Sequence, residues 1–93
     1  MPIDQKAIKV EMNQLIAVRD FNGMLAKAGN ILDDHPSSYL GRWWMARTLT
    51  FMGRTNEALD WLMMGMRKAE SDEEESKIAS SMANVYNVQN QWE

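Results

Sequence analysis

The sequence contains no cysteine, one histidine, two prolines and no long apolar run. The absence of cysteine excludes disulfides, thiolate metal sites and cysteine nucleophiles, and it fits a reducing compartment. No apolar run approaches the roughly 18–20 residues of a membrane-spanning helix. Residues 1–6 lack the basic-then-apolar order of a signal peptide. We therefore expect a soluble, cytoplasmic protein without a membrane partner.

Positive charge is also scarce. Ten Lys and Arg residues against thirteen Asp and Glu residues leave a formal net charge of −3. This balance argues against a general nucleic-acid binder, because phosphate binding needs a basic surface. A chain of 93 residues with 45% hydrophobic residues is expected to form one globular domain, residues 1–93.

Few side chains suit catalysis. His35 as a general base, oriented by the Asp34 carboxylate, is a conceivable catalytic pair, but the position beside Pro36 is typical of a solvated turn. The acidic residues 72–75 lack the alternating oxygen ligands and the glycine of a calcium loop. Phosphate-loop, zinc-site and nucleophile-elbow motifs are also missing. We expect no enzyme activity, no cofactor and no metal site.

What the sequence does contain is helical periodicity, and no segment alternates as a strand does. Residues 4–18 form the first predicted helix. Asp20 is the predicted N-cap of a second helix over residues 21–32, because its side chain can accept a backbone hydrogen bond. Pro36 disfavours helical geometry in the residue before it, so the second helix should stop at residues 33–36.

Three more helices follow. Ser37 or Ser38 is expected to cap the third, and Gly53 to end it in the left-handed conformation. Thr55 is expected to cap the fourth, and the acidic residues 72–75 to open the fifth. The residues expected to face the core include Ile8, Met12, Leu15, Ile16, Met24, Leu25, Ala28, Ile31, Leu32, Ala58, Leu59, Leu62, Met63, Met66, Ile78, Ala79, Met82, Val85 and Tyr86.

When the chain is aligned with itself at one fixed offset, residues of its first half match residues of its second half. The matched pairs are Met12 with Ala46, Leu15 with Leu49, Leu25 with Leu59, Ala28 with Leu62, and Leu32 with Met66. Helices joined by two or three residues must fold back as antiparallel hairpins. The offset equals the helix–turn–helix period of about 34 residues that is typical of tetratricopeptide repeats.

Individual residues strengthen this resemblance. Residues 45–59 resemble the tetratricopeptide pattern through Met45-Ala46, Gly53 and Ala58-Leu59. Residues 82–86, with Trp92 beyond them, resemble the first helix of a further unit, which begins a few positions later than the period requires. The first unit departs from the pattern. Met12 and Met24 occupy its small-residue positions and Glu11 a large apolar one.

The resemblance implies an all-α fold of stacked antiparallel hairpins in a short right-handed superhelix. Its units would span about residues 5–36 and 39–70, with a capping helix or partial unit over residues 73–93. A generic helical-hairpin bundle remains the alternative fold. In the family, the first helices of successive units line a groove that holds a peptide or a helix.

Transferred to this chain, that geometry predicts a partner-binding groove. The site residues it implies are Lys6, Lys9, Asn13, Trp43, Arg47, Thr50, Lys77, Asn84 and Asn87, with Ile16, Ala17, Leu40, Phe51, Ser80 and Val88 alongside. None is acidic, so the resemblance implies a partner with acidic or carboxylate groups. Lys9, Asn13 and Lys77 match a carboxylate clamp of some family members, whereas Trp44 and Ser81 replace two of its residues.

The predicted function is therefore a non-catalytic protein–protein interaction module, an adaptor or chaperone-like protein. Nine methionines and four tryptophans suit adaptable contact surfaces and interaction hot spots. One alternative is a self-associating structural protein, with Trp92 packing into a neighbouring copy. Another is the N-terminal interaction part of a longer repeat protein.

Overall fold

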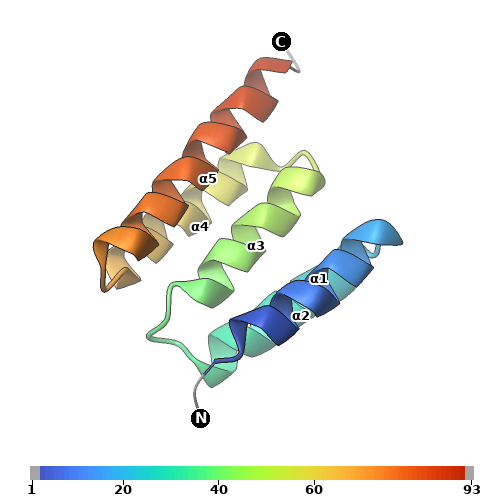
Figure 1. The fold of residues 1–93 in the computed structure, drawn as a ribbon. Coiled ribbons are helices and arrows are strands. Elements are labelled where there is room, and N and C mark those ends of the chain that lie inside the picture. Colours follow the sequence, from blue (N-terminus) through green and yellow to red (C-terminus); the bar gives the residue numbers. More distant parts are fainter. Residues whose placement is uncertain (1–2, 92–93) are drawn as a thin grey trace.

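The structure is a computed structural model that describes residues 3–91. Trp92, invoked above for self-association, lies outside the described residues. The chain forms the helices α1 (Gln5–Ala17), α2 (Phe21–Asp34), α3 (Leu40–Phe51), α4 (Thr55–Lys68) and α5 (Asp72–Gln91) (Figure 1). Between residues 3 and 91 there is no strand, so the predicted all-α class is confirmed.

The helices lie in two layers. Figure 1 shows α1, α3 and α5 in the nearer layer, with α2 and α4 behind them, and each helix runs opposite to the next. Each helix packs against the next one along the chain, and α3 also contacts α5. None of the helices between residues 3 and 91 has the length and apolar character needed to cross a bilayer.

The offset seen in the sequence recurs in the helix boundaries and in the turns. α2 and α4 begin at Phe21 and Thr55 and end at Asp34 and Lys68. Their starts and their ends are therefore both separated by the offset of the sequence repeat. In the first turn the Asp20 N–H donates to the Leu15 carbonyl at 2.9 Å. The same 2.9 Å bond joins the Arg54 N–H to the Leu49 carbonyl in the second turn. Both turns are Schellman motifs, in which the crossed bond satisfies a free carbonyl at the helix end.

Left-handed backbone at Arg19 and Gly53 makes these turns possible. Arg19 has a φ of 57° and Gly53 a φ of 79°. Glycine adopts this conformation without a steric penalty, whereas a residue with a Cβ does not. The prediction that Gly53 ends the third helix in the left-handed conformation is confirmed.

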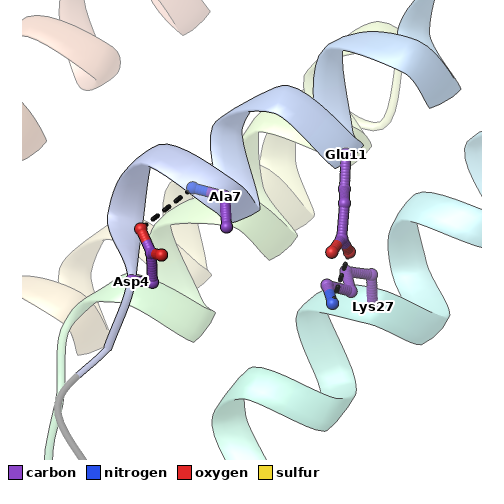
Figure 2. Close-up of polar contacts among 4 residues, drawn as sticks. All are labelled: Asp4, Ala7, Glu11 and Lys27. Atoms are coloured by element: carbon purple, nitrogen blue, oxygen red, sulfur yellow. Dashed lines mark hydrogen bonds and ion pairs between the residues drawn. The ribbon is translucent and has the colours of Figure 1, made fainter.

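Several predicted helix ends need correction. α1 is shorter than residues 4–18, because Asp4 is its N-cap and accepts the Ala7 N–H at 3.1 Å (Figure 2). α2 continues to Asp34, since the His35 N–H still bonds to the Ile31 carbonyl. Asp20 does cap α2, accepting the Gly23 N–H.

The predicted cap of α4 is wrong. Thr55 is the first residue of the helix, and the N-cap is Arg54, which makes no side-chain capping bond. The Thr55 hydroxyl instead accepts a hydrogen bond from the Gln89 side chain at 3.0 Å. Ser38 accepts the Leu40 N–H, although the N-cap of α3 is Tyr39. Tertiary packing has therefore overruled local capping at α4.

A core of buried side chains runs between the two layers. It consists of Met12, Met24, Ala28, Ile31, Tyr39, Leu40, Trp44, Ala46, Leu49, Ala58, Leu62, Ile78 and Val85. Three residues predicted to face it, Met63, Ala79 and Tyr86, are exposed instead. Met63 lies one position beyond the buried stripe of α4. Within residues 3–91, α5 packs against α4 and α3 and against no other helix.

Candidate functional site

A cleft of about 620 Å³ opens on the side of the molecule formed by α1, α3 and α5. These are the three helices of one layer in Figure 1. Its lining residues are Gln5, Lys6, Lys9 and Asn13 from α1; Leu40, Trp43, Trp44, Ala46, Arg47 and Thr50 from α3, with Tyr39 before it; Leu62 from α4; and Ser76, Lys77, Ser80, Ser81, Asn84 and Val85 from α5.

Most residues of the predicted groove lie along this cleft. The structure brings together Lys6, Lys9, Asn13, Trp43, Arg47, Thr50, Lys77 and Asn84. Asn87 does not line the cleft, and neither do Ile16, Ala17, Phe51 and Val88. Phe51 stacks on Phe21, with ring centroids 6.0 Å apart and planes 5° apart. Its ring therefore packs against the start of α2.

The cleft carries charge of one sign. Lys6, Lys9, Arg47 and Lys77 line it, and no Asp or Glu is among its lining residues. The chain as a whole carries a formal net charge of −3. A concave surface lined by one sign of charge focuses the electrostatic field and raises the local concentration of ions of the opposite sign. The cleft is thus suited to an anionic ligand.

Arg47 occupies a distinctive position in the cleft. Its guanidinium lies over the rings of Trp43 and Trp44, 4.9 and 5.4 Å from their centroids. Its buried Nε has no hydrogen-bond partner, and Arg47 forms no ion pair within residues 3–91. Burial lowers the pKa of the Arg47 guanidinium from its ordinary value. An anion would restore the electrostatic stabilisation that this side chain loses on leaving water.

The two tryptophans form a rigid wall. Trp43 and Trp44 meet edge to face, with centroids 4.9 Å apart and planes 79° apart. The Trp43 Nε1–H donates to the Ser81 hydroxyl at 2.8 Å, which joins α3 to α5. Because its polar group is already bonded, the Trp43 ring is held in one orientation. Arg47 is consequently supported by side chains from two helices.

The sequence does not reveal the roles that Ser81 and Trp44 have in the cleft. The sequence identifies both only as replacements in a clamp pattern, yet Ser81 fixes Trp43 and Trp44 packs under Arg47. Thr50, by contrast, is expected to face a partner, but its hydroxyl donates to the Ala46 carbonyl at 2.8 Å. The pairing of Trp43 with Ser81 spans two helices, so no local sequence signal could reveal it.

The other candidate chemistry lies elsewhere. His35 is the C-cap of α2 and lines a separate hollow of about 400 Å³ with Lys68, Glu70 and Glu74.

No protein-family model, curated protein or solved structure significantly matches this chain. The residues of the cleft therefore supply the basis for a functional proposal.

Proposed function

We propose that the protein binds an acidic segment of another protein in the cleft between α1, α3 and α5, and that it makes and breaks no covalent bond. The observation that carries this proposal is a cleft lined by cations from three helices without a carboxylate. In this role the protein is an adaptor or chaperone-like protein of the cytoplasm. The segment would be an extended peptide or a helix.

We also propose a tetratricopeptide-type architecture, with two hairpins and the capping helix α5 stacked as a short right-handed superhelix. The boundaries of α2 and α4 and the paired Schellman turns, which recur at the same offset as the sequence repeat, support it. The shared cleft of α1, α3 and α5 supports it as well, since alternate helices of such a stack line one concave surface.

Recognition would follow from the charges and the aromatic wall. Lys6, Lys9 and Lys77 would attract an acidic segment over a distance of roughly 8 Å at physiological salt. Arg47 would then pair with a carboxylate, because its planar guanidinium matches the two carboxylate oxygens. The wall of Trp43 and Trp44 would exclude water from that pair and strengthen it.

Titration of the labelled protein with a synthetic peptide tests this function. The probe is a short peptide of Asp, Glu and Leu with a free carboxyl terminus, and the control peptide has Lys in place of Asp and Glu. We expect the acidic peptide to shift the indole N–H signals of Trp43 and Trp44 in nuclear magnetic resonance spectra. The signal of Trp61, which does not line the cleft, serves as the internal reference.

Charge reversal supplies the matched control. Lys9→Glu with Arg47→Glu should reduce affinity for the acidic peptide at least about tenfold, because attraction becomes repulsion. Arg67→Glu with Lys68→Glu changes the net charge equally at exposed positions of α4 outside the cleft, and should have little effect. Equal losses in both variants, or no loss in either, would contradict the proposal. Circular dichroism verifies that both variants retain their helices.

A further inference from the structure

One side of α1 carries exposed apolar side chains. We define the α1 outer face as Ala7, Val10, Gln14 and Val18, which lie on one side of the helix and are all exposed. Val10 is 57% and Val18 72% exposed. Large apolar side chains left this open are a feature of interaction surfaces when they cluster.

The internal repeat indicates what such a face is built to contact. At the positions of α3 that match Ala7, Val10 and Gln14 in the repeat, the chain carries Gly41, Trp44 and Thr48, and all three are buried. Gly41 lies against α2, since a Cβ there would be 2.7 Å from the backbone nitrogen of Leu32. The face that α3 buries against a preceding helix is therefore the one that α1 leaves open.

The opposite end of the molecule has a second open face. We define the α5 outer face as Ala79, Ala83, Tyr86 and Asn90, all exposed. In the alignment of the partial unit with the second one, Ala83 and Tyr86 match Ala46 and Leu49, and those two α3 residues are 1% and 2% exposed. Arg42, on the same side of α3, lies against Gly65 of α4. α5 thus leaves open the face that α3 buries against the following helix.

Charge is missing from this part of α5. Residues 78–90 contain no charged side chain, although much of that stretch is exposed. A solvated helix face normally carries Lys, Glu or Asp, and the cores of protein interfaces are depleted of them. The polar residues of this stretch are uncharged Ser, Asn and Gln. The lack of charge on α5 therefore favours a contact surface.

We propose that copies of this chain associate head to tail, the α1 outer face of one copy packing antiparallel on the α5 outer face of the next. The spacings match. Val18, Gln14, Val10 and Ala7 would lie opposite Ala79, Ala83, Tyr86 and Asn90.

Charge complementarity favours this pairing of α1 with α5 over a pairing of two α5 helices. Arg19, directly after Val18, would lie near the acidic first turn of the next copy's α5, which includes Glu75. The carboxylate of the following residue, Asp20, is bonded to the Gly23 N–H of its own α2. Lys6 would lie near the carboxyl-terminal end of that α5, where the helix dipole favours positive charge. An antiparallel pair of α5 helices would provide no such cation at either end.

α1 and α5 lie on opposite sides of α3 (Figure 1), so one copy could contact one neighbour through α1 and another through α5. A contact between two different faces does not close on itself unless the rotation forms a ring. The assembly should therefore grow beyond a dimer as concentration rises. Neither face includes a cleft-lining residue, so this proposal does not rest on the proposed function.

Blocking one face at a time tests the proposal by analytical ultracentrifugation of the full chain. Val10→Glu with Val18→Glu blocks the α1 outer face, and Ala83→Glu with Tyr86→Glu blocks the α5 outer face. We expect the unmodified protein to form species larger than dimers and each variant alone to be monomeric. An equimolar mixture of the two variants should form dimers and nothing larger, because one intact face of each kind remains.

Two results would overturn the proposal. The first is an unmodified chain that stays monomeric across a wide concentration range, which would leave the open faces to another protein. The second is self-association that persists in either variant, which would indicate pairing of like faces. Circular dichroism guards against misfolding, and formation of the mixed dimer is itself proof that both variants fold.

Discussion

The two hairpins share their turns and the boundaries of their second helices but differ in how closely their helices pack. The backbones of α3 and α4 approach each other over a long stretch, whereas α1 and α2 come close over a much shorter one. Ala46 and Ala58 lie in the second hairpin where Met12 and Met24 lie in the first, and all four side chains are buried. Small residues allow the backbones to approach, and methionines fill the wider gap that remains.

A polar contact accompanies the wider spacing. Lys27 of α2 forms an ion pair with Glu11 of α1 at 2.5 Å (Figure 2). The matching positions in the second hairpin are Trp61 and Met45, both partly buried against the core. At this half-exposed edge an ion pair therefore joins the helices of the first hairpin. Apolar side chains occupy the matching edge of the second hairpin. One repeat can thus keep its turn geometry while its packing changes.

The largest expected effect comes from overfilling the close-packed hairpin. Ala58→Trp should lower the free energy of unfolding by about 3 kcal/mol or more, because the α3–α4 spacing leaves no room for the ring. Met24→Trp, at the matching position, should cost only about 1–2 kcal/mol, since a large side chain is already accommodated there. Urea denaturation measures both. Equal losses would show that the hairpins do not differ in spacing as described.

The turns offer a second, smaller contrast. Gly53→Ala should lower the free energy of unfolding by about 1 kcal/mol, because a Cβ is disfavoured at a φ of 79°. Arg19→Gly should raise it by about 0.5 kcal/mol, since relief of strain exceeds the added freedom of the unfolded chain. Thermal melts monitored by circular dichroism follow both variants. A stabilising Gly53→Ala substitution would mean that the left-handed turn is wrong.

The smallest expected effect concerns the ion pair. A double-mutant cycle with Glu11→Gln and Lys27→Gln should give a coupling energy of about 0.5 kcal/mol that falls with added salt. The two side chains are 51% and 33% exposed, so water screens their attraction. The Arg54–Glu57 pair is comparably exposed and serves as the reference cycle. A coupling far above that reference would mean that charge, rather than methionine packing, holds α1 on α2.

Helix formation and the turns could be predicted locally, because they depend on neighbours in the chain. The spacing of apolar residues predicts five helices, Asp20 is recognisable as a cap and Gly53 as a left-handed terminator. Thr55 is misassigned because its hydroxyl bonds to Gln89, a residue of another helix that no local rule includes. Met63 is misassigned because a broad apolar stripe does not specify which edge is covered.

Sequence alone determined the helical class, the internal repeat and the acidic net charge, since periodicity and composition do not depend on what the chain packs against. Tertiary structure decided that Arg47 rests on Trp43 and Trp44, that Ser81 fixes Trp43, and that the cations share one cleft. It also decided which apolar faces of α1 and α5 remain open. These properties depend on distances between helices, and the order of residues along a single helix does not contain them.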